Sequence, residues 1–230
     1  MPDDSRIKIA PSILAADFAR LGEETAAAAA GGADYIHVDV MDGVFVPPIT
    51  LGAQMIAAIK PHAAHVPLVV HMMVSAPERH VASMAAAGGD IIVVHAEAGG
   101  DPGGTLAAIR GSGARPGLAV KPDTPVEMIE PLLDGLAIAL VMTVNPGYGG
   151  QPYMREVEGK ITRLRSRIDA RGLEVMLEVD GGINDETAAR AARAGARILV
   201  AGTGVYGRAE PVAERIAALR RIAESALEPE

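Results

Sequence analysis

The chain has 230 residues, 49% of them hydrophobic, and a net charge of −8 from 21 basic and 29 acidic residues. Aromatic residues make up only 3% and Trp is absent, whereas a nucleic-acid surface needs a basic stripe and stacking rings, so we expect no nucleic-acid partner. The absence of Cys excludes disulfides and thiolate ligands. A metal ion must therefore be held by His, Asp, Glu and water.

The apolar runs are short. The longest of them, such as LAIALVMTV at 136–144, fall far below the ~20 residues of a membrane helix, so no segment is expected to span a bilayer. The N-terminal MPDDSRIKI is acidic and polar and lacks the apolar stretch of a secretory signal. We expect a cytoplasmic protein.

Strand-like runs alternate with helix-like stretches along the whole chain. Strands are predicted at 8–14, 35–40, 67–74, 91–97, 117–120, 136–144, 174–180 and 197–202. Helices are predicted at 16–31, 76–89, 154–172 and 184–195, where apolar residues recur every three or four positions after Asp, Asn or Ser. A strand followed by a helix eight times, without a long linker, predicts a single domain over 1–230, an α/β fold of the (β/α)8 TIM barrel type.

A weak internal repeat supports this unit. The phrases AAAGGADYIHVD, AAAGGDIIVVHAE and ARAGARILVAGT each end a helix with Gly and enter a strand after a short turn. The competing architecture, an open doubly wound sheet, places a Gly-rich phosphate loop after the first strand. Here PSILAADF stands in that position, and the barrel is favoured.

Polar residues gather at the predicted C-terminal ends of the strands, where barrels carry their active sites. Residues two apart on a strand face the same way, so His37, Asp39 and Met41 share one side of the strand at 35–40. An unpaired buried carboxylate costs several kcal/mol, and Asp39 therefore needs a partner. His71 and Asp180, at the ends of two other strands, complete a set of two imidazoles and two carboxylates. This set suits Zn, Fe(II), Mn or Co without choosing among them.

His95 and Glu97 follow the fourth strand. We interpret them as structural residues or as supports of the ligands. His95 in particular is expected to be a core histidine with its hydrogen bonds satisfied rather than a ligand.

Three glycine-rich loops follow the last three strands: NPGYGGQP at 145–152, DGG at 180–182 and AGTG at 201–204. Each alone is explained as a tight turn, but three neighbouring loops present backbone N–H groups to an anion in the part of a barrel where phosphates bind. Without a Walker-type Lys or a G-x-G-x-x-G after the first strand, a small sugar phosphate is favoured over a nucleotide.

A metal beside two carboxylates favours proton removal next to a carbonyl, with the charge stored as an enediolate. Returning the proton to the opposite face inverts the carbon, which needs one acid/base group on each face, and Asp39 and Asp180 are the available pair. Met41, Met73 and Met142 are expected either to line the reacting carbon and exclude water or simply to fill the core.

Six blocks in this order, PSILAADFARLGEE, HVDVMDGVFVPPITLG, VHMMV, VHAEA, VMTVNPGYGGQPY and EVDGGI, closely resemble the ribulose-phosphate 3-epimerase family, over roughly residues 8–220. The family interconverts D-ribulose 5-phosphate and D-xylulose 5-phosphate. The resemblance implies a (β/α)8 barrel, an isomerase of the pentose phosphate pathway, and a dimer or hexamer of identical chains.

The resemblance also implies site residues. One divalent metal would be bound by His37, Asp39, His71 and Asp180, with Asp39 and Asp180 as the acid/base pair. The residues expected to bind the substrate and its phosphate are Ser12, His71, Gly147, Tyr148, Gly149, Gly150, Asp180, Gly181, Gly182, Gly202 and Thr203.

Two departures from the family pattern bear on the substrate. The first block reads SILAAD where SILSAD is usual, which leaves Ser12 in place, and the last strand ends in AGTGVYG where AGSAIFG is usual. Thr203 adds a methyl group, and Gly204 is expected to loosen the start of the last helix. Relatives that act on D-allulose 6-phosphate share the metal site and also have Thr near this position, so the length of the ketose stays open. A phosphate-binding barrel without catalysis is expected to lack one of the two carboxylates, and both are present.

Overall fold

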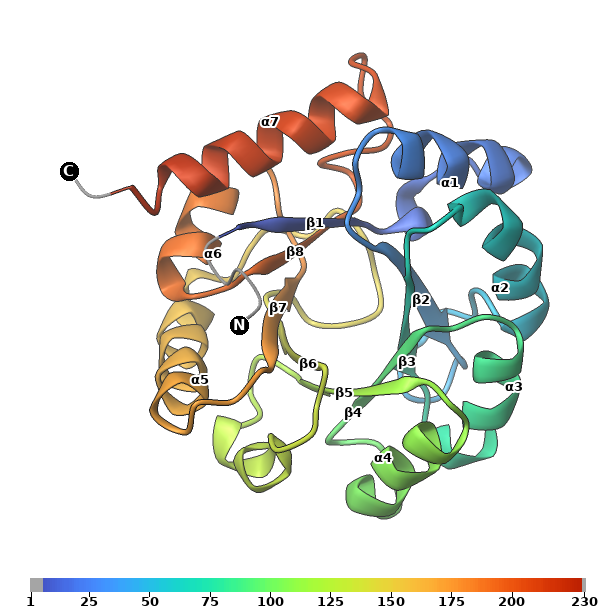
Figure 1. Cartoon of the computed structure of the whole chain (residues 1–230), viewed down its shortest axis with the longest axis vertical. Coiled ribbons are helices and arrows are strands. Elements are labelled where there is room, and N and C mark those ends of the chain that lie inside the picture. The colour runs from blue at the N-terminus through green and yellow to red at the C-terminus, as the bar shows by residue number, and fades with distance from the viewer. Residues whose placement is uncertain (1–5, 229–230) are drawn as a thin grey trace.

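The computed structural model describes residues 6–228, in which eight parallel strands form one sheet that curls into a barrel with helices around its outside (Figure 1). The sheet order is β1-β8-β7-β6-β5-β4-β3-β2. The strands are β1 Lys8–Pro11, β2 Ile36–Met41, β3 Leu68–Met73, β4 Ile91–His95, β5 Arg115–Val120, β6 Ile138–Met142, β7 Met176–Asp180 and β8 Ile198–Ala201. Each predicted strand is present, with bounds that differ by a few residues.

The barrel closes between β1 and β2. Ser12 and His37 form a parallel bridge just past the end of β1. Below it, the Asp34 N–H donates to the Ile9 carbonyl at 3.0 Å, and the Ile9 N–H donates to the Asp34 carboxylate at 2.9 Å. The domain is thus a TIM barrel, as predicted.

Seven α-helices cover the sheet within residues 6–228 (Figure 1). They are α1 Leu21–Ala30, α2 Ala53–Ile59, α3 Val81–Ala86, α4 Pro102–Gly111, α5 Glu158–Ala170, α6 Ala188–Ala194 and α7 Val212–Ser225. The predicted helices at 16–31, 76–89 and 154–172 begin with short 3-10 turns before α1, α3 and α5. None of these α-helices is long and apolar enough to cross a membrane.

The prediction that a helix follows every strand is wrong for one of the eight strands, β5. Between β5 and β6 the chain forms two 3-10 turns, Val126–Met128 and Glu130–Leu132, instead of an α-helix. This segment contains Pro122, Pro125 and Pro131, and each proline removes a backbone donor and disfavours the α conformation of the residue before it.

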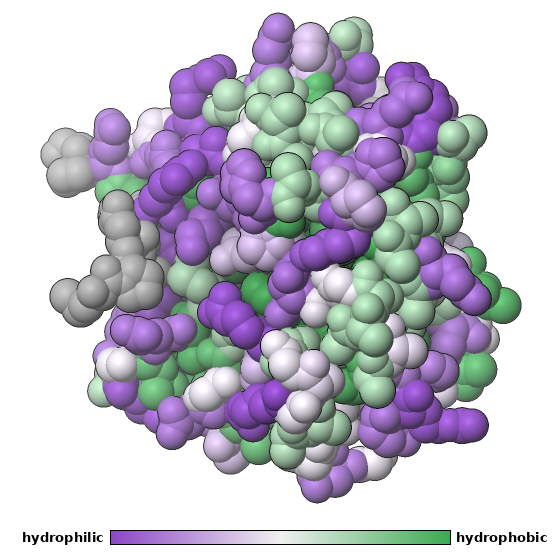
Figure 2. Space-filling view, turned by 45° about the vertical axis from the view of Figure 1, so that its right-hand side comes forward, coloured by the Kyte–Doolittle hydropathy of each residue, from purple (hydrophilic) through white to green (hydrophobic). Residues whose placement is uncertain are grey.

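The core has two layers, which follow from the two-residue period of the strands. On β2, Ile36, Val38 and Val40 pack in the layer between sheet and helices. The barrel interior is filled by a second cluster that includes Val69, Val93 and other strand residues. Outside, weakly hydrophobic and hydrophilic residues are interleaved over the side on which α1, α2 and α3 lie (Figure 2), as expected for helices that bury only one stripe.

Lys160 of α5 replaces the missing helix as support for the β5–β6 connection. Its ammonium donates to the carbonyls of Lys121, Pro122 and Thr124 at 2.9, 2.5 and 2.5 Å. The loop that follows β5 is therefore held by one cation.

We expect Lys160→Met to lower the free energy of unfolding by about 2 kcal/mol, because it removes three hydrogen bonds from a charged donor. Urea unfolding at neutral pH measures this. Arg163→Met is the matched control on the same helix, since Arg163 is 61% exposed and, among residues 6–228, forms an ion pair only with the exposed Glu127. The cost of this control substitution should stay below ~1 kcal/mol. Equal costs for both variants would contradict the supporting role of Lys160.

Candidate active site

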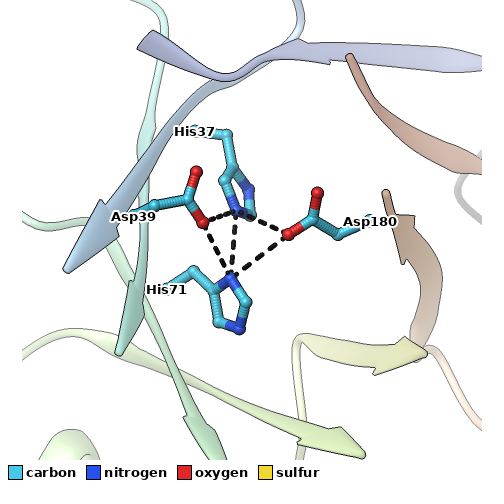
Figure 3. A group of neighbouring side chains, drawn as sticks. All are labelled: His37, Asp39, His71 and Asp180. Carbon is cyan, nitrogen blue, oxygen red and sulfur yellow. Dashed lines mark hydrogen bonds and ion pairs between the residues drawn. The ribbon is translucent and has the colours of Figure 1, made fainter. Parts of the chain in front are cut away.

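Four ligand-type side chains meet at the C-terminal ends of three strands (Figure 3). His37 and Asp39 come from β2, His71 from β3 and Asp180 from the end of β7. The register of β2 and β3 sets Asp39 directly beside His71. One ligand atom from each residue lies within 4.8 Å of all the others, so the four residues grouped in the sequence analysis do come together.

The spacing of these atoms fits a metal ion. His37 Nε2 lies 3.4 Å from His71 Nδ1, and Asp39 Oδ1 lies 3.3 Å from His37 Nε2 and 3.0 Å from His71 Nδ1. Asp180 Oδ2 lies 3.7 Å from His37 Nε2 and 3.4 Å from His71 Nδ1. Ligands placed 2.0–2.1 Å from a tetrahedral ion are about 3.4 Å apart. The cluster can therefore hold a divalent cation.

Burial and charge shift the pKa values of the cluster. Burial by itself lowers the pKa of His37, but the Asp39 carboxylate outweighs it, and the pKa of His37 lies well above its usual value. The pKa of His71 is also raised, because hydrogen bonds to Asp180 and Asp39 outweigh its burial. Burial would raise the pKa of Asp39, but His37 and His71 hold it well below its usual range. Without a metal, protons on the imidazoles supply the positive charge that the carboxylates require.

His95 lies outside the four-residue cluster, and both of its ring nitrogens have partners. His95 Nε2 is 2.9 Å from His71 Nε2, and His95 Nδ1 is 3.0 Å from Glu97 Oε2. Burial lowers the pKa of His95 to about 4. Burial raises the pKa of Glu97, but the hydrogen bond with His95 outweighs it and the pKa lies at about 2. His95 is thus a buried core histidine with partners at both ring nitrogens, as the sequence predicted.

Glu178 of β7 approaches the other imidazole. Its carboxylate is completely buried and lies 3.2 Å from His37 Nδ1. The angle falls outside that of a hydrogen bond, so this contact is an ion-pair distance rather than a formed bond.

Ser12 holds the second oxygen of Asp39. The Ser12 hydroxyl donates to Asp39 Oδ2 at 2.6 Å, while Asp39 Oδ1 faces the imidazoles. Ser12, whose backbone pairs with His37 where the barrel closes, therefore also orients the Asp39 carboxylate.

A pocket opens above Asp39 and Asp180. Met41, Met73 and Met142 line it, and all three methionines are buried. His71 is completely buried and is not among the lining residues. Ten of the eleven residues predicted to bind substrate line the pocket: Ser12, Gly147, Tyr148, Gly149, Gly150, Asp180, Gly181, Gly182, Gly202 and Thr203.

The glycine loops leave backbone donors for a bound anion. The N–H groups of Gly182, Gly202 and Thr203 donate to no acceptor within residues 6–228. Arg208 Nε donates to the Thr203 carbonyl at 2.7 Å, and because a trans peptide points its N–H opposite to its C=O, the Gly204 N–H faces away from Arg208. The glycine loops thus present neutral N–H groups, a kind of donor that can bind an anion.

Gly204 does not loosen the last helix, contrary to the expectation from sequence. Helix α7 begins only at Val212, and a Cβ atom at Gly204 would lie 2.5 Å from the Ile183 carbonyl oxygen. Gly204 instead lets the loop after β8 pack tightly against the loop after β7.

Two residues that support the pocket were missed by the sequence analysis. The Gln151 amide donates to the carbonyls of Asn145 and Tyr148 at 2.7 and 2.8 Å, which closes the loop after β6. Arg215 is only 7% exposed, and its guanidinium donates to the Gly204 carbonyl at 3.0 Å and to the Asp185 carboxylate at 2.5 Å. The available sign of this role was the position of Arg215 beside Ile216 and four residues before Leu219, on the face of α7 that carries its buried apolar residues.

The fold and the site together define a TIM-barrel enzyme with a metal-type ligand cluster beside a pocket lined by glycine-rich loops. The family model described as the ribulose-phosphate 3 epimerase family matches residues 8–206. The chain belongs to the ribulose-phosphate 3-epimerase family, as its motifs predicted, and is an epimerase.

Curated relatives match along most of their length. The ribulose-phosphate 3-epimerase of Bacillus subtilis (strain 168) is 47% identical over 205 residues, 89% of this chain and 94% of the relative. That of Rhodobacter capsulatus is 45% identical over 232 residues and covers 99% and 100% of the two chains. The Escherichia coli (strain K12) enzyme is 43% identical over 198 residues, 86% and 88% of the two chains.

Solved structures at low identity share the fold alone. The structure of KGPDC from Streptococcus mutans aligns with a TM-score of 0.67 at 13% identity, over 97% of this chain and 100% of that one. Thiamine phosphate pyrophosphorylase from Pyrococcus furiosus aligns at 0.65 and 15% identity, over 98% and 99%.

If the four-residue cluster binds zinc, we expect the affinity to fall as the pH is lowered from about 8 to about 6, because the raised pKa values of His37 and His71 place protons on the nitrogens that the ion would need. For each imidazole that is protonated, the apparent affinity for zinc falls about tenfold when the pH is lowered by one unit. Competition titration with a chromophoric chelator measures the dissociation constant. The control His80→Gln, at an exposed histidine, should keep the same pH profile, and a flat profile in the parent protein would contradict the raised pKa values.

Proposed function

We propose that the chain interconverts D-ribulose 5-phosphate and D-xylulose 5-phosphate by removing and returning the proton at C3. One observation carries the proposal. Two carboxylates, Asp39 from β2 and Asp180 from β7, face each other across one cluster (Figure 3) and line the same pocket as the glycine-rich loops. Inversion of a carbon requires an acid/base group on each of its faces, and this pair can supply them.

Asp39 and Asp180 act as the acid/base pair. In each direction one carboxylate takes the C3 proton and the other, entering as the acid, donates a proton to the opposite face, so the proton count balances over the turnover. Ser12 keeps Asp39 in place through the 2.6 Å hydrogen bond to its second oxygen. Asp180 is the more accessible of the two, with 15% of its side chain exposed against 5% for Asp39.

The four-residue cluster is proposed to hold one divalent ion, Zn, Fe(II), Mn or Co, through His37, Asp39, His71 and Asp180. When bound, such an ion supplies a Lewis acid that polarises the substrate carbonyl and disperses the charge of the enediolate. The donor set of two nitrogens and two oxygens suits these ions. The direct contact of His71 with the substrate, implied by the family resemblance, also stays a proposal.

The walls of the pocket complete the reaction site. The thioethers of Met41, Met73 and Met142 have no proton to lose, and their burial keeps water from the reacting carbon. The phosphate is proposed to bind the free N–H groups of the three glycine loops, which positions C3 between the two carboxylates. Neutral donors suit a phosphate that must also leave with the product.

We also propose that the chain forms a homo-oligomer, a dimer or a hexamer. The support comes from two apolar side chains that are exposed on the loop after β2: Val44 is 76% exposed and Ile49 is 81% exposed. Side chains of this kind are commonly covered in interfaces between subunits.

The test of the proposed activity is a comparison of kcat/KM for D-ribulose 5-phosphate and D-allulose 6-phosphate. We expect the pentulose phosphate to have the higher value. A higher value for the hexulose phosphate would assign the chain to the alternative ketose, to which the added methyl of Thr203 points, while keeping the same chemistry.

Asp180→Asn is expected to reduce epimerisation by about 100-fold or more, the usual contribution of a general acid/base group. Exchange of solvent deuterium into one epimer through Asp39 should persist. Proton NMR of the sugar phosphates in deuterium oxide measures both, with the metal content determined alongside. Asp134→Asn, at an exposed loop residue, is the control and should match the parent protein. Full turnover in Asp180→Asn would remove this residue from the mechanism.

A further inference from the structure

Each imidazole of the cluster faces the other ligands with one ring nitrogen. Its second ring nitrogen faces a residue outside the cluster, and each of these contacts leads to a carboxylate. His37 meets Glu178 directly, at 3.2 Å. His71 meets its carboxylate through an intermediate: His71 Nε2 contacts His95 Nε2 at 2.9 Å, and His95 Nδ1 contacts Glu97 at 3.0 Å. We propose that Glu97, acting through His95, fixes the tautomer of His71 so that its Nδ1 is the metal-binding nitrogen. This inference rests on the proposed metal site and deepens it.

The proton positions follow from the end of this chain of contacts. An ionised carboxylate only accepts hydrogen bonds, so His95 must carry its proton on Nδ1. The 2.9 Å contact between His95 Nε2 and His71 Nε2 needs one donor and one acceptor, and His95, with its proton on Nδ1, offers the lone pair of Nε2 as the acceptor. His71 must therefore carry its proton on Nε2, which leaves the lone pair of Nδ1 free to bind a cation.

Glu97 is fixed by two donors at once. Its Oε2 faces His95, and its Oε1 accepts from the Lys121 backbone N–H at 2.7 Å, at the end of β5. Only a carboxylate accepts through both of its oxygens. The residue type at position 97 is thus dictated by the two donors that it must satisfy.

Solvent cannot correct the tautomers, because the rings are inaccessible. His71 is completely buried and His95 is 1% exposed. Phe45 packs on the His95 ring with 4.9 Å between centroids, and the Lys121 ammonium lies 3.9 Å above the Phe45 ring. His95 and Glu97 are therefore positioning residues, which touch neither substrate nor metal and act through His71.

Glu97→Gln tests the proposal with a side chain of the same shape. A glutamine has one acceptor oxygen, so its NH2 group must face either the Lys121 N–H or His95 Nδ1, and the second choice reverses both tautomers. We expect the dissociation constant for Co²⁺ to rise about 10- to 100-fold, measured from the visible absorption of the bound ion. Glu127→Gln, on the exposed partner of Arg163, is the matched control and should bind Co²⁺ like the parent protein.

Two substitutions at His95 test whether the acceptor at the position of Nε2 is what maintains the Co²⁺ affinity. His95→Gln places an amide oxygen near the position of Nε2 and should keep most of the Co²⁺ affinity, whereas His95→Leu removes the acceptor and should lose it. Thermal unfolding of the metal-free variants separates a merely structural role, which lowers the melting temperature and leaves the dissociation constant unchanged. Equal affinities of His95→Gln and His95→Leu would overturn the proposal.

The tautomers can also be measured in the parent protein, which tests the proposal even where a variant fails to fold. Imidazole ¹⁵N NMR of the zinc-loaded protein should show His95 protonated on Nδ1 and His71 on Nε2, and the opposite tautomers would overturn the inference. If the parent protein itself binds no Co²⁺ in a 1:1 complex, the proposed metal site fails and this inference fails with it. If the parent protein binds Co²⁺ and Glu97→Gln binds it equally well, only the inference fails.

Discussion

The burial of Asp39 inside the barrel is the constraint on which the site depends. A carboxylate that is 3% exposed is tolerated only beside positive charge and hydrogen-bond donors. The pairing of β2 with β3 sets His71 next to it, His37 lies two residues back on the same strand, and Ser12 donates to its second oxygen. Asp180 adds a second negative charge from across the barrel, and the cluster consequently demands a cation, either protons on the imidazoles or a metal ion.

The side of the pocket that the glycine-rich loops line differs from the cluster, because none of the basic side chains that the structure describes lines it. Its predicted contacts are neutral N–H groups of glycine loops, and the arginines nearby donate to the backbone carbonyls rather than line the pocket. Arg208 and Arg215 donate to the carbonyls of Thr203 and Gly204, and the N–H groups of Gly202 and Thr203 donate to no acceptor within residues 6–228. The positive charge of the arginines thereby orients peptide groups, and the proposed binding of the phosphate relies on backbone dipoles.

The low-identity structural neighbours show why the barrel alone does not assign the chemistry. They share its architecture at TM-scores of 0.65 and 0.67 with 15% and 13% identity. Since one fold hosts many reactions, the assignment rests on the family match and on the residues at the strand ends. The outer contacts of His37 with Glu178, and of His71 with His95 and through it Glu97, extend that site by one layer of residues.

The amino-acid sequence by itself determined the strand positions, the barrel class and the membership of the metal-type cluster, because the period of two along β2 and the position of polar residues at strand ends are local properties. It overestimated the helices, since the prolines between β5 and β6 outweighed the expected eightfold repeat. It also misplaced the effect of Gly204, whose role depends on the Ile183 carbonyl, more than twenty residues away. Only the tertiary structure decided that His95 contacts His71, that Gln151 and Arg215 support the glycine loops, and that Lys160 holds the β5–β6 connection. The contacts of His95 and Lys160 join residues distant in the chain, and their existence depends on how the barrel closes and in which register its strands pair. The Gln151 contacts span only three and six residues, but they depend on the conformation of the whole loop after β6.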